Sequence, residues 1–178
     1  MKYRIFGSSN IEVSEIGFGG WGIGGNYGNS IAYGPTKDEE SIEALNTSYE
    51  KGINFFDTSP LYGFGHSEKL IGKVFKNKRK NLIYATKVGY TNFKGQQNFS
   101  AKFIETSLND SLRRLKTDYV DLFQMHDLSF QQLENSDDII ETLLLLKKKG
   151  KCRYFGFSNK AQNDAKRVIK KKFFESVQ

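Results

Sequence analysis

Four residues that can donate, accept or stabilise a proton stand where apolar segments of the chain end. They are Asp57 and Tyr62 in INFFDTSPLYG, Lys87 at the end of LIYATK, and His126 at the end of YVDLFQMH. A tyrosine hydroxyl, with a reference pKa of ~10, can give a proton to a carbonyl oxygen, and a nearby ammonium stabilises the phenolate that remains. An imidazole can hydrogen-bond the same oxygen and orient it. The four residues therefore predict one proton-transfer site.

Taken singly, each of these residues has an ordinary structural explanation. Asp57 could be a turn residue or helix cap, and Tyr62 a packed aromatic ring. Lys87 could be a strand-end lysine, and His126 a hydrogen-bonded interior histidine. As a set they are different, because an acid at the end of an apolar strand is costly without a partner, and the next strand ends on a lysine. In barrels of alternating strands and helices, chemistry is assembled at the carboxyl ends of the strands.

The elements that must position these residues alternate along the chain. Residues 3–6 and 11–13, separated by Gly7-Ser8-Ser9-Asn10, predict a β-hairpin. Six strand-like segments follow, at residues 14–17, 53–57, 82–87, 119–126, 152–157 and 173–178. Helical patterns separate them, near residues 36–49, 67–76, 101–115, 137–149 and 161–172. This alternation predicts an α/β fold of parallel βα units, in a single domain over residues 1–178.

The glycine-rich loop after the first of these strands contains GFGGWG, which matches the G-x-G-x-x-G pattern of a dinucleotide site. Such a site needs a helix that starts at the third glycine. Here the next helix is expected only after Pro35, where Thr36 and Glu39 predict a capping box. We therefore interpret the match as fortuitous, and expect the loop to line a substrate pocket with aromatic residues such as Trp21 and Tyr27.

The formal net charge is +7, and basic runs occur at residues 76–80, 147–149 and 170–172. All three runs fall at ends of predicted helices, where lysines face water and the helix dipole. No aromatic side chains are interleaved with the charges as a base-stacking surface requires. We expect a solvated basic surface and no nucleic-acid partner.

Composition bounds the remaining classes. Hydrophobic residues make up 38% of the chain and aromatic residues 14%, which is typical of a globular domain. No segment approaches the ~18 consecutive apolar residues of a membrane span, and residues 1–10 lack the apolar core of a signal peptide. The single cysteine, Cys152, excludes an internal disulfide and a CxxC pair, and no ligand cluster suggests a metal. These features predict a soluble cytoplasmic protein that contacts no membrane.

The segment GINFFDTSPLYG at residues 52–63, with Ser67-Glu68 and Leu70-Ile71-Gly72 after it, resembles the most recognisable stretch of the aldo-keto reductase family. By this resemblance Asp57, Tyr62, Lys87 and His126 form the catalytic tetrad, with Tyr62 as the acid. The resemblance implies reduction of an aldehyde or ketone, the small-molecule partner, by NADP(H), with NAD(H) as the alternative. It also makes Asp127, Trp21 and Tyr27 candidates for the substrate pocket.

Two further segments resemble the part of the family that holds the nicotinamide. GFSN at residues 156–159 is similar to the strand end whose serine and asparagine bind the carboxamide, which implies roles for Ser158 and Asn159. FESVQ at residues 174–178 is similar to the next strand, which implies that Gln178 joins this contact. Asp57 is expected near the same cofactor.

The family fold is a TIM-type (β/α)8 barrel of ~250 residues, with a β-hairpin before the barrel. Because the sequence predicts six strands of the series, we expect an incomplete, C-terminally truncated barrel that lacks the last two βα units. Three functions stay open: a reductase, alone or with a complementing chain that supplies those units; a catalytically inactive truncated or interrupted fragment; and a cofactor-binding regulatory subunit.

Overall fold

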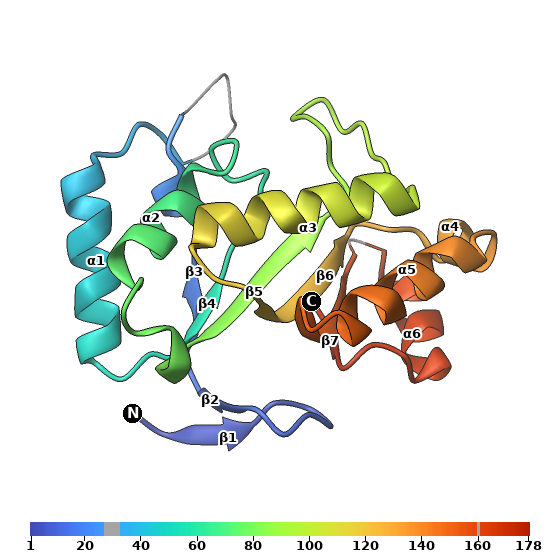
Figure 1. Ribbon diagram of the computed structural model, residues 1–178, viewed down its shortest axis with the longest axis horizontal. Coiled ribbons are helices and arrows are strands. Elements are labelled where there is room, and N and C mark those ends of the chain that lie inside the picture. The colour runs from blue at the N-terminus through green and yellow to red at the C-terminus, as the bar shows by residue number, and fades with distance from the viewer. Residues whose placement is uncertain (27–32, 160) are drawn as a thin grey trace.

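The computed structural model describes residues 1–26, 33–159 and 161–178, which are built around one parallel sheet (Figure 1). Six strands pair in the order β3-β4-β5-β6-β7-β8, so each strand lies beside its neighbours in the chain. The strands are β3 Phe18–Gly19, β4 Phe55–Asp57, β5 Ile83–Val88, β6 Val120–His126, β7 Cys152–Ser158 and β8 Ser176–Val177. The prediction of six parallel βα-type strands is confirmed, and the curled sheet is an incomplete (β/α)8 barrel with β3 and β8 as its outer strands.

Helices cover the outside of the sheet and follow the strands in sequence (Figure 1). The α-helices are α1 Asp38–Glu50, α2 His66–Val74, α3 Ala101–Leu115, α4 Phe130–Glu134, α5 Asp137–Lys148 and α6 Gln162–Lys171. Two 3₁₀ helices, η1 Gly22–Gly24 and η2 Arg79–Asn81, complete the elements of the described residues. None of the helices in the described part of the chain is both long and apolar enough to cross a membrane.

The predicted hairpin is confirmed as the antiparallel pair β1 Tyr3–Ile5 and β2 Glu12–Ser14. It is tied to the segment that enters β4, because Asn54 Oδ1 accepts from Ser14 N at 2.8 Å and Asn54 Nδ2 donates to Glu12 O at 3.0 Å. The hairpin therefore lies at the amino ends of the strands, and it leaves the carboxyl ends open for a site.

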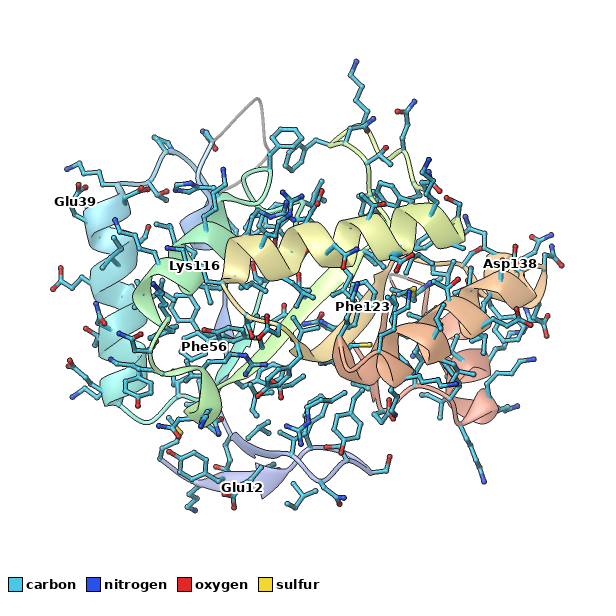
Figure 2. All side chains as sticks on the ribbon, viewed as in Figure 1. Glu12, Glu39, Phe56, Lys116, Phe123 and Asp138 are labelled. Carbon is cyan, nitrogen blue, oxygen red and sulfur yellow. The ribbon has the colours of Figure 1, made fainter. Side chains whose placement is uncertain are left out.

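The core lies between the sheet and the helices that cover it. Helix α3 turns Ile104, Leu108 and Leu115 inward at a helical spacing, and each of the three is at most 1% exposed. Burying such a side chain contributes about 1.5–3 kcal/mol. Figure 2 shows Phe56 and Phe123, both fully buried strand residues, in the interior. This packing holds the strands rigidly under the residues at their ends.

Two expectations about local structure were wrong. The first strand of the sheet begins at Phe18 instead of residue 14, because Ser14 is taken by β2, where it pairs with Tyr3. Helix α1 begins at Asp38 with Lys37 as its N-cap residue and no side-chain cap. Thr36 is therefore one position too early for a capping box, and its buried hydroxyl has no hydrogen-bond partner among the described residues.

Helix α4 was not predicted, although its start has a clear signal. Ser129 Oγ accepts from Gln132 N at 3.1 Å, and Gln132 Oε1 accepts from Ser129 N at 2.9 Å. This reciprocal pair is a capping box. The helix is only five residues long, so its apolar pattern is too short to indicate a helix by periodicity.

Candidate active site

Four strands deliver polar side chains to one edge of the sheet. Asp57 ends β4, Lys87 is the penultimate residue of β5, His126 ends β6 and Ser158 ends β7. In the register of the sheet His126 lies opposite Ser158. Because the strands are parallel, all of these residues lie at carboxyl ends, where such a fold assembles its chemistry. The structure thus brings these four sequence-predicted residues to the same edge of the sheet.

Lys87 is the centre of the cluster. Its Nζ donates to Asp57 Oδ2 at 2.5 Å, to the Tyr62 hydroxyl at 3.2 Å and to the Thr58 carbonyl oxygen at 3.1 Å. The Lys87 side chain is only 2% exposed and that of Asp57 is 13% exposed. A buried ammonium needs such partners, since desolvation of an unpaired charge costs several kcal/mol. The three acceptors satisfy all three ammonium hydrogens.

Tyr62 reaches Lys87 from the turn that follows β4. The turn is anchored at its start by Thr58 N, which donates to Ala85 O at 2.8 Å, and closed by Tyr62 N, which donates to Ser59 O at 3.0 Å. The next residue, Gly63, has φ +62°, and a Cβ there would lie 2.1 Å from Gly24 O. Only glycine satisfies both this conformation and this close approach, so Gly63 fixes the position of the tyrosine.

Burial raises the pKa of Tyr62 above its usual value of 10.0, and the nearby Lys87 ammonium offsets part of this effect. The negative charge of Asp57 acts in the same direction as burial. Removal from water disfavours the phenolate more than the ammonium favours it. Tyr62 is therefore a protonated hydroxyl at neutral pH, in direct contact with a cation.

His126 lies beside Tyr62 with its ring edge-on. The ring centroids are 6.4 Å apart at an interplanar angle of 87°, and a second contact of the same kind joins His126 to Tyr90 at 4.9 Å. Gln97 Nε2 donates to the carbonyl oxygens of both His126 and Asp127, each at 3.0 Å. These contacts fix the end of β6 against the segment that follows β5.

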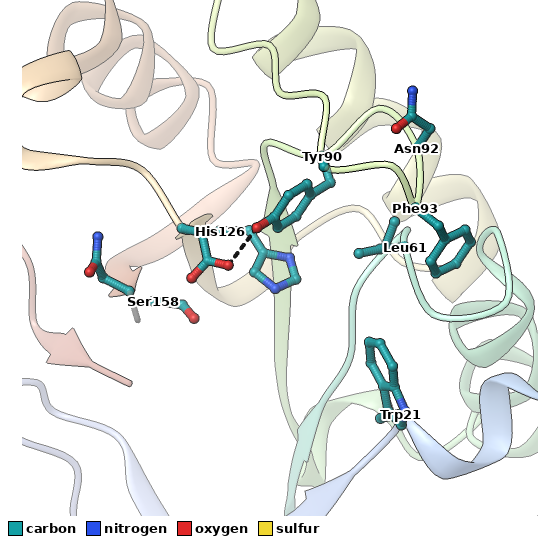
Figure 3. Close-up of a pocket in the computed structure, with 10 residues that line it drawn as sticks. Trp21, Leu61, Tyr90, Asn92, Phe93, His126 and Ser158 are labelled. Atoms are coloured by element: carbon teal, nitrogen blue, oxygen red, sulfur yellow. Dashed lines mark hydrogen bonds between the residues drawn. The ribbon is translucent and has the colours of Figure 1, made fainter. Parts of the chain in front are cut away.

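A cavity of about 380 Å³ adjoins this cluster (Figure 3). Its apolar walls include Trp21, Leu61 and Phe93, and its polar walls include His126, Asp127 and Ser158. The ring of Trp21 contacts that of Tyr62 edge-on, with centroids 4.9 Å apart. The described residues that line the cavity do not include Asp57, Tyr62 or Lys87. The cavity therefore adjoins the cluster through the side chains of His126 and Trp21.

The structure also places the residues predicted for the substrate pocket. Trp21 and Asp127 both line the cavity, whereas Tyr27 lies outside the described residues. Asp127 has φ +56°, and its Oδ2 accepts from the Tyr90 hydroxyl at 2.6 Å, the bond dashed in Figure 3. Asp127 N donates to Ser158 O at 2.7 Å, which continues the β6–β7 pairing past the strand end.

The residues predicted to hold a nicotinamide differ in their placement. Ser158 and Asn159 both line the cavity. The amide of Asn159 is already engaged by backbone, since its Nδ2 donates to Leu128 O at 2.7 Å and its Oδ1 accepts from Ala161 N at 2.5 Å. Gln178 is exposed and outside the cavity lining, and its backbone pairs with that of Asn159 and Phe157. The Ser158 hydroxyl at the cavity wall can both donate and accept a hydrogen bond, and the Asn159 amide keeps one hydrogen and one lone pair beyond these contacts.

Sequence reasoning missed Gln124, which directly contacts the cluster. Its Nε2 donates to Asp57 Oδ1 at 2.8 Å, and the residue is 2% exposed. Gln124 precedes His126 by two positions in β6, so the two side chains share one face of the strand. A polar residue in the middle of an apolar strand was the available signal, because buried amides need hydrogen-bond partners.

The curled parallel sheet and the polar cluster at its carboxyl edge define a barrel protein of the (β/α) class. Residues 15–178 match the sequence pattern of the Aldo/keto reductase family, and the chain belongs to that family. The uncharacterized oxidoreductase YqkF of Bacillus subtilis is 33% identical over 99% of this chain and 55% of its own length. L-galactose dehydrogenase of Arabidopsis thaliana is 36% identical over 89% of this chain and 48% of its own length.

Solved structures give the same result. An aldo-keto reductase from Bacillus halodurans, in its holo form, superposes with a TM-score of 0.85 at 34% identity, over 99% of this chain and 56% of that one. The glycerol dehydrogenase of Gluconobacter oxydans superposes with a TM-score of 0.76 at 28% identity, over 99% of this chain and 54% of that one. The chain thus spans about half the length of the relatives that it matches.

Proposed function

We propose that the protein is an NADPH-dependent oxidoreductase that reduces an aldehyde or ketone to an alcohol, with Tyr62 as the proton donor. The observation that carries the proposal is the position of Lys87 Nζ, 2.5 Å from Asp57 Oδ2 and 3.2 Å from the Tyr62 hydroxyl. A tyrosine acid needs a cation beside it, because the ammonium stabilises the phenolate that forms when the proton leaves. Membership of the family supports the same chemistry.

The proposed mechanism assigns a separate task to each side chain. Tyr62 gives its proton to the substrate carbonyl oxygen, and Lys87 stabilises the resulting phenolate through the contact already present. Asp57 holds the Lys87 ammonium in place. His126, which lines the cavity, donates a hydrogen bond to the same carbonyl oxygen and sets its orientation. Trp21 and Leu61 exclude water from the apolar side of the cavity.

Ser158 and Asn159 line the cavity and would hold a nicotinamide there, which when bound would supply the hydride for the carbonyl carbon. Ser158 and Asn159 would contact its carboxamide, since both line the cavity and the Asn159 amide keeps one hydrogen and one lone pair beyond its two backbone contacts. We propose NADP(H) as the cofactor, with NAD(H) as the alternative for titration. Gln178 would have to turn its exposed side chain toward Asn159 to contribute.

We place the described residues in one cytoplasmic reductase domain. Its full activity requires the last two βα units of a complete (β/α)8 barrel, which would follow the six described strands. The outer strands β3 and β8 are each paired on one side only in the described sheet, which supports this requirement. A complementing chain is one source of those units. An inactive fragment and a cofactor-binding subunit are the alternatives that the experiment must separate.

The test compares the chain alone with a chimera that adds the C-terminal part of the Bacillus halodurans relative after Gln178. Each is titrated with NADPH and NADH and assayed for carbonyl-dependent oxidation of the cofactor. The panel includes L-galactose and glycerol in the oxidation direction, with NADP+ or NAD+ as the hydride acceptor, because two relatives are named for them. We expect weak binding by the chain and turnover by the chimera. A folded chimera that binds NADPH and turns over no substrate would favour the regulatory role.

A further inference from the structure

Gln124 holds the second oxygen of the Asp57 carboxylate. Lys87 Nζ donates to Asp57 Oδ2 at 2.5 Å, and Gln124 Nε2 donates to Asp57 Oδ1 at 2.8 Å, so each oxygen of the carboxylate has its own donor. A carboxylate held at one oxygen can rotate about its last side-chain bond, since that torsion is broad. With both oxygens held, its plane is fixed.

The sheet is built to keep this amide in place. In the register, Gln124 lies between Lys87 on β5 and Gly156 on β7. A Cβ at position 156 would lie 2.7 Å from Gln124 Cγ, 3.1 Å from its Oε1 and 2.5 Å from Ser176 Oγ. A side chain on β7 would therefore push the amide out of its position. The absence of one at Gly156 leaves the space that the Gln124 side chain uses.

The ammonium of Lys87 depends on the carboxylate for its own position. Its other two acceptors are the Thr58 carbonyl oxygen at 3.1 Å and the Tyr62 hydroxyl at 3.2 Å, both longer than the contact to Asp57. Charge-assisted hydrogen bonds are roughly twice as strong as neutral ones. A rotation of the Asp57 carboxylate would therefore carry the ammonium away from the tyrosine.

We propose that Gln124 is a positioning residue of the active site, which holds Asp57 so that Lys87 stays in contact with the Tyr62 hydroxyl. The residue touches neither the substrate nor the reacting atoms, and it acts through two other side chains. The proposal rests on the proposed function for its catalytic meaning, but the geometric coupling that it describes can be measured without turnover.

The test follows the ionisation of Tyr62 by NMR in protein labelled with ¹³C-tyrosine, with the Tyr62 signal assigned by its loss in Tyr62→Phe. The charged and titratable groups around Tyr62 are Lys87, Asp57, Tyr33 and the neighbouring ring of His126. Gln124→Met changes none of these charges and nearly preserves the volume of the side chain. If the ammonium moves away, its lowering effect is lost and the Tyr62 pKa rises further above its usual value.

Gly156→Ala is the second variant, because it displaces the amide while leaving Gln124 itself intact. It is expected to raise the Tyr62 pKa in the same direction. Ser176→Ala is the matched control on the neighbouring strand, since its buried hydroxyl has no hydrogen-bond partner among the described residues, and it should leave the pKa unchanged. An unchanged Tyr62 pKa in a folded Gln124→Met or Gly156→Ala protein would overturn the proposal.

Where the chimera turns over substrate, a second measurement separates positioning from packing. Gln124→Met should lower kcat about tenfold with KM unchanged, because the lost contact acts on the proton transfer and not on binding. A rise in KM alone would contradict the proposal. If the titration supports the coupling and no protein reduces a carbonyl, the positioning role stands and the proposed function fails.

Discussion

The Lys87 ammonium lies 2.5 Å from the Asp57 carboxylate, although the two residues are not paired in the sheet. Asp57 pairs with Ala85, and Lys87 follows Ala85 by two positions on β5. Ala85 and Lys87 share one face of β5, because side chains alternate along a strand. The small alanine leaves room for the lysine side chain to lie back toward β4. The offset allows the same ammonium to reach Tyr62 on the turn beyond β4.

The first prediction concerns the stability of this pair. Lys87→Met should lower the free energy of unfolding by about 3–5 kcal/mol, because it leaves the Asp57 carboxylate in a buried site without its cation. The double variant Asp57→Asn with Lys87→Met should recover most of the loss, since no charge then remains unpaired. Urea denaturation of the three proteins checks both statements. A loss below about 1 kcal/mol for Lys87→Met would show that the carboxylate does not depend on the ammonium.

The second prediction concerns the proton donor. In the active protein, Tyr62→Phe should lower carbonyl reduction by 10²-fold or more, on the order of what positioned acids contribute. Phenylalanine keeps the ring that contacts Trp21, so cofactor affinity should stay within about twofold. Cofactor oxidation and a binding titration measure the two effects separately. Retained activity would remove Tyr62 from the role of acid.

A third prediction uses the single tryptophan of the chain. Trp21 lines the cavity and contacts the Tyr62 ring, so a ligand that enters there changes the environment of its indole. Binding of NADPH is expected to quench the tryptophan fluorescence in a saturable manner. Trp21→Phe removes this signal and should leave a binding isotherm measured by calorimetry. Binding by calorimetry without any change in Trp21 emission would place the cofactor away from this cavity.

The general architecture and the cluster were predictable from the sequence because both follow from local patterns. The period of apolar residues distinguishes strands from helices, and strict alternation implies parallel pairing. Asp57, Lys87 and His126 could be grouped because parallel strands end on the same side. Ser158 was predicted in a different way, from the resemblance of GFSN at residues 156–159 to a family segment.

What the sequence did not predict depends on contacts between distant segments. The bond from Gln124 to Asp57 joins residues 67 positions apart, and it exists only because the register sets Gly156 beside the amide. The contact of the Asn159 side chain with Leu128 O could not be assigned before the two strand ends were placed together, because the two residues are 31 positions apart. The start predicted for the first strand of the sheet was wrong because Ser14 pairs with Tyr3 in the β-hairpin. The local pattern of apolar residues does not show which of the two strands Ser14 belongs to.

A fourth prediction concerns a buried carboxylate behind the cluster. Glu68 is 0% exposed, and it accepts from Thr86 Oγ1 at 2.6 Å and from Arg114 Nε at 2.6 Å. It thereby fixes the residue before Lys87 on β5 to helix α3. Glu68→Gln keeps the shape but removes the charge opposite Arg114, so unfolding should become easier by about 3 kcal/mol.

Glu105→Gln is the matched control for this experiment. Glu105 pairs with Lys149 at 2.8 Å, but both side chains are about 40% exposed, and water screens such a pair. Denaturant midpoints of the two variants should therefore differ clearly, with Glu105→Gln close to the unmodified protein. Equal midpoints would mean that the Glu68–Arg114 pair is no more important than a surface pair.

The final prediction is a dependence of stability on pH that comes from Cys152. Burial raises the pKa of this thiol from 9.0 to about 12, while the charge of Lys147 acts to lower it and that of Glu175 to raise it. Above pH 9 the thiol ionises in the unfolded chain but not in the folded chain. Ionisation therefore lowers the free energy of the unfolded state and leaves that of the folded state unchanged. Stability from this group is complete below pH 9 and is lost as pH rises toward 12, at about 1.4 kcal/mol per pH unit.

Cys152→Ala tests this dependence through its slope. The variant begins from a lower free energy of unfolding because it loses buried volume, but its decline between pH 9 and 10 should be shallower than that of the unmodified protein by about 1 kcal/mol. Above pH 10 both proteins should decline further, because burial also raises the pKa of Tyr84. Denaturant unfolding at several pH values measures the two slopes. Parallel curves over this interval would show that the thiol ionises as readily in the folded protein as in the unfolded chain.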